Sequence, residues 1–222
     1  MACGCVHTVA AMAGLRRAFG RRRRQGLALA REALQLRALP PRVAWFYVRA
    51  WLTALRTGDR FTLDSATRPS DVSRLLALAR GHAMTVELGT GTAWTTIALA
   101  LADPARRVVS YDPEVRAQRE RYLRLIPADA RARIELLTGP AEDVRPAASS
   151  VGFLFIDCSH DRETTAAAFT TWRPAVAPEG VVVFHDYDHP RYPGVREAVE
   201  QLGLQGTRSR GVFIWRAAGQ RP

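Results

Sequence analysis

The chain has 222 residues, 47% of them hydrophobic and 24% charged, and these fractions exclude a disordered or membrane-embedded protein. The formal net charge is +11, and all 32 basic residues are arginine. Outside positions 16–24 the arginines are mixed with acidic residues, which predicts a solvated surface rather than a nucleic-acid-binding patch.

The cysteine pattern and the N-terminus favour a cytoplasmic protein. The three cysteines form neither a disulfide framework nor a zinc pattern, as is typical of a reducing compartment. The basic run Arg21–Arg24 follows the weakly apolar stretch that it would precede in a signal peptide. The most apolar segment, Val43–Leu55, is too short to span a bilayer and contains Arg49, so we expect no membrane insertion.

We expect three segments along the chain. Residues 1–25 are predicted to be a basic, disordered leader, 26–64 a helical cap segment, and 65–222 the main domain. The aromatic-rich helix Val43–Arg56 in the second segment suits either packing on the core or covering a ligand site, and the two roles are compatible. A further helix is predicted from Pro69, with proline in its first turn, to Arg80, just before Gly81.

Apolar runs then alternate with helical segments. Near-continuous apolar strands separated by helices indicate a parallel sheet that is covered on both faces. Arg210 and Gly211 between two short strands indicate a terminal antiparallel hairpin. We therefore predict an α/β, Rossmann-like, mostly parallel seven-stranded sheet. The expected strands before the hairpin are Ala83–Leu88, Arg107–Tyr111, Ile134–Leu137, Val151–Ile156 and Val181–Phe184, and the expected helices are Trp94–Leu101, Glu114–Leu125, Arg162–Trp172 and Pro193–Leu202.

Ligands of such sheets bind beyond the carboxyl ends of the strands, so the residues that follow each strand are the candidates. After the first strand, Gly89 and Gly91 permit a tight turn and close approach of a ligand to the backbone. Asp112 ends the second strand, 21 residues after Gly91, where an acid accepts hydrogen bonds from ribose hydroxyls.

The turn favours S-adenosylmethionine over a dinucleotide. Trp94 stands where a dinucleotide fingerprint has its third glycine. The carboxylate of Glu87 would repel a pyrophosphate, but it suits a ligand with an amino group or a sulfonium.

The motifs VELGTGTAW at 86–94 and YDPE at 111–114, the strand end at Asp157 and the terminal hairpin resemble those of class I S-adenosylmethionine-dependent methyltransferases. The stretch 155–199 is similar to small-molecule O-methyltransferases, including macrolide and antibiotic-sugar enzymes. The resemblance covers residues 65–216 and implies that the main domain binds S-adenosylmethionine.

The resemblance also implies roles for residues at the strand ends. Those after the first strand would frame the methionine part of the cofactor, and the acid after the second would take the ribose. The loop 139–142 would edge the adenine, and the acid after the fourth strand would lie where cofactor and acceptor meet. The residues implied for the cofactor are Glu87, Gly89, Gly91, Asp112, Glu142 and Asp157.

Many members of this family bind a divalent metal through acids after the fourth and fifth strands. Asp157 and Asp186 match two of these positions, whereas His185 stands where an acid is common and Ser159 replaces another acid. We expect Asp157, His185 and Asp186 as a possible Mg²⁺ or Mn²⁺ set, although hard cations prefer oxygen ligands. Alternatively, His185 and Asp186 hydrogen-bond locally and hold the loop.

The predicted reaction is methyl transfer to a hydroxyl of a small-molecule acceptor. His160 and His185 are the candidate bases beside Asp157, since histidine titrates near neutrality, and His189 is a weaker candidate. A methyltransferase of RNA or protein, suggested by the basic leader, and a non-catalytic or NAD-binding Rossmann protein are the alternatives. Nucleic acid is not the expected partner, because the run Arg21–Arg24 contains no aromatic residue and lies far from the motifs in sequence. The pattern predicts neither the acceptor nor the oligomeric state.

Overall fold

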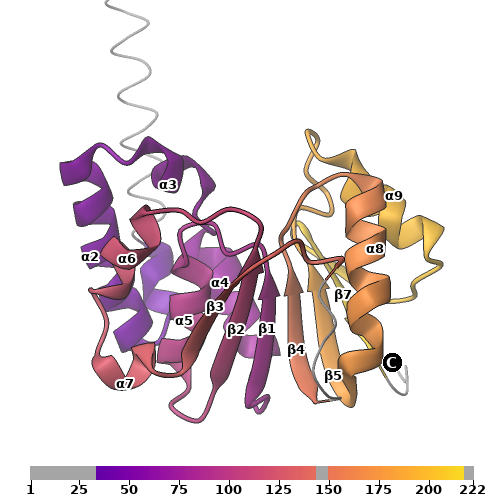
Figure 1. Cartoon of the computed structure of the whole chain (residues 1–222), viewed down its shortest axis with the longest axis horizontal. Helices are drawn as coiled ribbons and strands as arrows, with labels where there is room; N and C mark the ends of the chain where they lie inside the picture. Colours follow the sequence, from indigo (N-terminus) through magenta and orange to yellow (C-terminus); the bar gives the residue numbers. More distant parts are fainter. Residues whose placement is uncertain (1–33, 144–149, 218–222) are drawn as a thin grey trace, which may run out of the picture.

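The computed structural model describes residues 34–143 and 150–217, so the expected leader 1–25 lies outside the described residues. Its centre is a seven-stranded sheet in the order β3-β2-β1-β4-β5-β7-β6, with helices packed along it (Figure 1). Strands β1 to β5 are parallel, and β7 runs antiparallel to both β5 and β6. The predicted fold class is confirmed. The strands are β1 (Met84–Leu88), β2 (Arg107–Asp112), β3 (Ile134–Thr138), β4 (Val151–Ile156), β5 (Val176–Phe184), β6 (Thr207–Ser209) and β7 (Val212–Arg216).

The core lies on both faces of the sheet because successive side chains of a strand point to opposite sides. In β4, Leu154 and Ile156 belong to the cluster that contains Phe169. Phe153 and Phe155 of the same strand pack in the opposite cluster with Leu75 and Leu99. Every residue of β4 is therefore buried, which explains its uninterrupted apolar sequence.

Strand β5 begins five residues earlier than the sequence predicts, at Val176 instead of Val181. The pairing with β4 shifts between Val151 and Phe153, so extra residues of β5 are accommodated in a bulge. A Cβ atom on Gly180 would lie 2.5 Å from a methyl group of Val176, which shows how tightly the chain folds there. The pattern of apolar residues in a sequence does not reveal a bulge of this kind, so the early start of β5 could not be predicted.

The terminal hairpin forms where it is predicted. Arg210 and Gly211, between β6 and β7, have φ values of 43° and 84°. Positive φ at both central residues is the geometry that lets a two-residue loop match the twist of its strands.

The helices agree with the predicted pattern except near 114. Glu114 donates its N–H to Asp112 Oδ1 at 2.7 Å, so the chain turns before α6 begins at Gln118. Two short helices, α3 and α7, were not predicted. The described helices are η1 (Leu36–Ala38), α2 (Pro41–Thr57), α3 (Arg60–Ser65), α4 (Pro69–Leu78), α5 (Trp94–Ala102), α6 (Gln118–Leu123), α7 (Ala128–Arg131), α8 (Arg162–Trp172), η2 (Arg173–Ala175) and α9 (Pro193–Gln201).

Helix α2 packs on the core and not over the ligand edge. Phe46 and Tyr47 are buried, and each meets the ring of Trp94 edge-on, at 5.9 and 5.3 Å between centroids. The first of its two expected roles is thus observed. Helix α3 and the residues after it lie nearer the carboxyl ends of the strands, at the top of Figure 1. Among the described residues, no helix has the length and apolarity needed to cross a membrane.

Candidate active site

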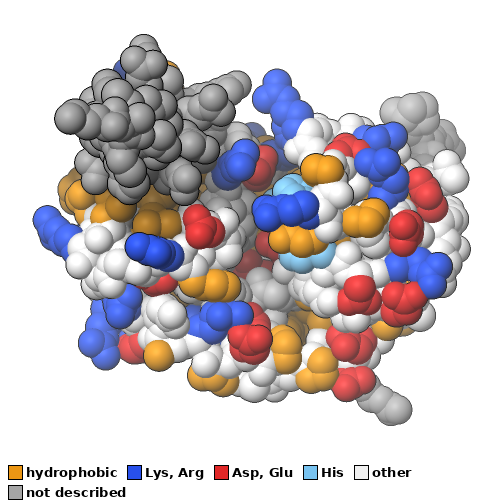
Figure 2. All heavy atoms as spheres, turned by 90° about the horizontal axis from the view of Figure 1, so that it is seen from above, with side chains coloured by type: hydrophobic (Ala, Val, Ile, Leu, Met, Phe, Trp, Pro, Cys, Tyr) orange, Lys and Arg blue, Asp and Glu red, His pale blue; other side chains and the backbone are white. Residues whose placement is uncertain are grey.

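A cavity of about 900 Å³ opens at the carboxyl ends of the strands. Its walls include residues after each of the five parallel strands, together with α3, the start of α4 and the tip of the β6–β7 hairpin. Figure 2 looks down on this edge and shows a hollow with acidic side chains at its floor and histidines at its rim. The volume is in the range of sites that hold a cofactor or a drug-sized ligand.

Both glycines of the β1–α5 turn line this cavity. Gly89 and Gly91 have φ values of 106° and 52°, which favour glycine. A Cβ atom on Gly89 would lie only 2.1 Å from the carbonyl oxygen of Asp157, so the turn presses directly on the end of β4. The close approach that Gly89 permits is therefore an approach of the turn to the end of β4, in addition to the expected approach of a ligand.

Asp112 lines the cavity from the end of β2, as expected. Its Oδ2 accepts a hydrogen bond from the N–H of Gly91 at 2.8 Å, and its Oδ1 accepts from the N–H of Glu114. Arg119 forms an ion pair with Oδ2 at 2.7 Å. The acid is held in one orientation with one side of Oδ1 left for a ligand, because a carboxylate oxygen accepts two hydrogen bonds.

Glu87 differs from its expected place. It is 1% exposed, is not among the residues that line the cavity, and accepts hydrogen bonds from the hydroxyls of Ser110, at 2.7 Å, and Thr96. Burial raises the pKa of Glu87 to about 8, so the side chain is largely neutral at pH 7. It therefore supports the turn from below, and in its neutral form it would not attract a cationic ligand by charge.

The loop after β3 lines the cavity with Pro140, Ala141 and Glu142. Helix α8 holds this loop through two bonds to backbone carbonyls. Trp172 Nε1 donates to Ala141 O at 2.8 Å, and Thr171 Oγ1 donates to Glu142 O at 2.9 Å. The loop is thus fixed where the resemblance places the edge of the adenine.

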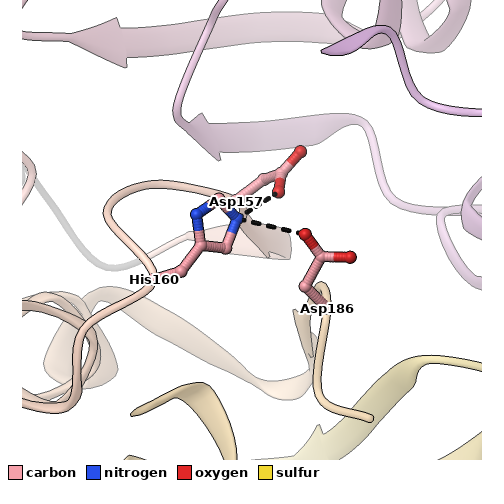
Figure 3. A group of neighbouring side chains, drawn as sticks. All are labelled: Asp157, His160 and Asp186. Atoms are coloured by element: carbon pink, nitrogen blue, oxygen red, sulfur yellow. Dashed lines mark ion pairs between the residues drawn. The ribbon is translucent and has the colours of Figure 1, made fainter. Parts of the chain in front are cut away.

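Two carboxylates and two imidazoles meet at the ends of β4 and β5. His185 Nδ1 is 2.8 Å from Asp157 Oδ1, within hydrogen-bond distance. His160 Nε2 lies between the two acids, 3.6 Å from Asp157 Oδ1 and 3.2 Å from Asp186 Oδ2 (Figure 3). All four side chains line the cavity.

The acids control the protonation of both histidines. Burial alone would lower the pKa values of His160 and His185, but Asp157 and Asp186 outweigh it and raise each to about 9. Burial alone would raise the pKa of Asp157, but His185 and His160 lower it to about 2. Each imidazole therefore carries a proton at neutral pH without a metal, contrary to the expectation that they titrate near neutrality.

The cluster fits a divalent cation through Asp157, His160 and Asp186. One ligand atom from each lies within 4.8 Å of the others, and His160 Nε2 faces both carboxylates. Asp186 has φ of 53°, a strained backbone that is common at functional sites. The set differs from the expected one: His185, whose Nδ1 is bonded to Asp157, is replaced by His160.

Tyr192 was missed by sequence reasoning, although it lines the cavity. Its ring stacks on His160, with centroids 4.2 Å apart, and also on His189, at 4.6 Å. A Cβ atom on Gly194 would lie 2.6 Å from His160 O, so the start of α9 packs directly on the His160 loop. The ring of His160 is thereby held by a residue 32 positions away, which no local pattern signals.

Residues 86–187 match the model of a family described as a methyltransferase domain. No curated protein matches the sequence significantly. The matched region runs from β1 to just beyond β5, so it contains the glycine turn, Asp112 and the four-residue cluster.

Solved structures share this fold. The O-methyltransferase from Bacillus cereus, in complex with S-adenosylhomocysteine, is 20% identical over 76% of this chain and 90% of its own, with a TM-score of 0.60. TomG from Streptomyces achromogenes, an O-methyltransferase of tomaymycin synthesis in complex with S-adenosylmethionine, is 22% identical over 77% and 90%, with a TM-score of 0.56. The TDP-rhamnose 3′-O-methyltransferase of calicheamicin biosynthesis is 19% identical over 66% and 78%, with a TM-score of 0.53. Residues 86–187 thus match a methyltransferase domain, and the described chain shares its fold with solved O-methyltransferases, two of them in complex with S-adenosylmethionine or S-adenosylhomocysteine.

Proposed function

We propose that this chain transfers the methyl group of S-adenosylmethionine to a hydroxyl of a small-molecule acceptor. One observation carries the proposal: Asp157, His160 and Asp186 line the same cavity as the glycine turn and Asp112. A cofactor held by the turn would meet an acceptor held at the cluster. The O-methyltransferases of the same fold, two of them in complex with S-adenosylmethionine or its product, support this reading.

Cofactor binding is assigned to residues from four strand ends. The backbone of Gly89 and Gly91 would lie along the methionine part, and Asp112 Oδ1 would accept from the ribose. Glu142 and its loop would edge the adenine, and Asp157 would lie between cofactor and acceptor. Glu87 acts on the cofactor only through the shape of the turn.

We further propose that Asp157, His160 and Asp186 hold Mg²⁺ or Mn²⁺. The mixed set of carboxylate oxygen and imidazole nitrogen suits these ions, with Mn²⁺ the more tolerant of nitrogen. Such a cation supplies Lewis-acid chemistry that makes an acceptor hydroxyl easier to deprotonate. His185 acts on this set through its hydrogen bond to Asp157.

In the transfer, the acceptor oxygen forms a bond to the methyl carbon while the carbon–sulfur bond breaks. The electron pair of that bond stays on sulfur and yields S-adenosylhomocysteine. Most of the rate gain comes from holding the two reactants in line and in contact. The proton of the hydroxyl would pass to a carboxylate oxygen of Asp157 or Asp186 that the cation leaves free, because His160 Nε2 either holds the cation or, without it, already carries a proton.

We place the methyltransferase domain at 65–222, a helical segment at 26–64, of which the described residues 34–64 pack on that domain, and the working enzyme in the cytoplasm. The compartment rests on the cysteine pattern, which forms no disulfide framework.

Transfer of tritiated methyl groups tests the function. Purified protein is incubated with labelled S-adenosylmethionine and a panel of hydroxylated small molecules, with RNA and protein substrates in parallel. Transfer to a hydroxylated small molecule is expected. Label found only in RNA or protein would contradict the proposed acceptor class, and calorimetry showing affinity for NAD but not for S-adenosylmethionine would contradict the cofactor.

A further inference from the structure

Arg119 is a buried cation beside the cavity that plays no part in the reaction described above. It lies on α6 with a side chain only 7% exposed, and it is not among the residues that line the cavity. Burying a guanidinium is costly unless its charge is paired and its donors are satisfied. The partners of Arg119 therefore indicate what its burial achieves.

Those partners belong to the two cofactor-binding elements. Arg119 Nε donates to Gly91 O at 2.8 Å, and its Nη2 lies 2.7 Å from Asp112 Oδ2. The N–H of Gly91 donates to the same Oδ2 at 2.8 Å. The three residues thus form a closed ring of contacts that joins the β1–α5 turn, the end of β2 and α6.

The ring fixes both ends of Gly91 and one end of the Asp112 carboxylate. Gly91 is held by its N–H and its carbonyl at once, and it adopts φ of 52°, a conformation that glycine can readily leave. At Asp112, Oδ2 accepts a hydrogen bond from Gly91 and forms the ion pair with Arg119, whereas Oδ1 has Glu114 as its partner and retains a free lone pair. Oδ1 is then the oxygen that a ribose hydroxyl would meet.

We propose that Arg119 is a positioning residue for the cofactor: it orients Asp112 Oδ1 toward the ribose and keeps the turn in its binding conformation. Arg119 does not itself touch the cofactor. The proposal rests on the proposed function, because it takes S-adenosylmethionine as the ligand of this turn. A purely structural arginine would affect stability alone, whereas a positioning arginine changes how well the protein distinguishes a ribose from a sugar without hydroxyls.

The test measures that discrimination. Calorimetry gives the Kd of S-adenosylhomocysteine and of an analogue in which hydrogen replaces both ribose hydroxyls. The wild type should bind the analogue about tenfold to a hundredfold more weakly than S-adenosylhomocysteine. The analogue cannot form the hydrogen bond to the charged Asp112, and a bond of this kind contributes about that much to affinity. In Arg119→Met the affinity for S-adenosylhomocysteine should fall by a similar factor, while the analogue should bind almost as before. Arg119→Lys, which keeps the charge but loses the planar fork of the guanidinium, should recover part of the preference for S-adenosylhomocysteine over the analogue.

Arg106→Met is the matched control. Arg106 is also buried, and its guanidinium donates to three backbone carbonyls, of Leu99, Ala79 and His82. Its loss should lower Tm but leave the ratio of the two Kd values unchanged. If Arg119→Met, or Arg119→Lys should the former not fold, retains the wild-type ratio, Arg119 is only structural and the proposal is wrong. A wild type that binds S-adenosylhomocysteine without discrimination also overturns it, whereas a wild type that binds neither ligand contradicts the proposed function itself.

Discussion

His185 Nδ1 lies 2.8 Å from Asp157 Oδ1, and this hydrogen bond joins the loop after β5 to the end of β4. His160 directs Nε2 toward both Asp157 and Asp186. The two histidines are therefore not equivalent. His160 is placed to bind a cation or a proton, and His185 is placed to orient an acid.

Replacing each histidine separates these roles. His160→Ala should abolish Mn²⁺ binding measured by calorimetry and reduce kcat by about a hundredfold or more. His185→Gln should keep Mn²⁺ binding, weakened by about tenfold, since partners of metal ligands contribute that much. His82→Ala, remote from the cavity, is the control and should change neither value. Unaltered Mn²⁺ affinity and kcat in His160→Ala would remove His160 from the mechanism.

Chelation tests the metal directly. Incubation with EDTA followed by desalting should abolish methyl transfer, and Mg²⁺ or Mn²⁺ should restore it, because the reaction would use the Asp157, His160 and Asp186 set. Full turnover in EDTA would leave proton transfer by the cluster as the only chemistry at this end of the cavity.

Asp112→Ala should weaken binding of S-adenosylhomocysteine by about 1–3 kcal/mol, because a hydrogen bond to a charged acceptor is lost. Asp129→Ala, which removes an exposed acid on α7, is the comparison and should leave Kd unchanged. Equal affinities of the two variants, measured by calorimetry, would show that Asp112 does not contact the ribose.

Glu87 makes stability depend on pH. Its pKa is about 8 in the folded protein, against a reference value of 4.5, so between these values the folded state holds a proton that the unfolded state has lost. Stability from this group is complete below about pH 4.5 and falls as pH rises to about 8. In urea unfolding, Glu87→Gln should flatten this decline, whereas Glu135→Gln, on β3, should not. An equally steep decline in Glu87→Gln would assign the pH dependence to other groups.

The N-terminal leader is expected to be dispensable for folding. Its sequence lacks apolar periodicity and contains Arg21–Arg24, so a chain that starts at Leu27 should keep its Tm within about 2 °C. Differential scanning calorimetry of the two chains measures this. A fall of many degrees would show that residues before Leu27 pack on the domain.

The fold and the glycine turn were predictable because they depend on local patterns. Apolar runs, turn glycines and an acid at a strand end are read within a few residues of one another, and Gly89, Gly91 and Asp112 all line the cavity. The ring of His160 is instead fixed by Tyr192, which is distant in sequence, so His185 was expected in its place. The sequence predicts a charged Glu87 because the residues next to it in the chain do not reveal that its side chain is buried beneath the turn.

The tip of the β6–β7 hairpin forms part of the cavity wall, through Arg210 and Gly211, and Arg74 Nη1 bonds it to α4 through Ser209 O at 2.6 Å. Every other described residue of the cavity wall precedes this hairpin in the chain. Since a chain is synthesised from its N-terminus, the turn and the cluster can be in place while this part of the wall is still missing. A ribosome that stops before residue 207 would release a protein without this wall, and β5 would expose the edge that β7 covers. Completion of the enzyme thus coincides with protection of its sheet from aggregation.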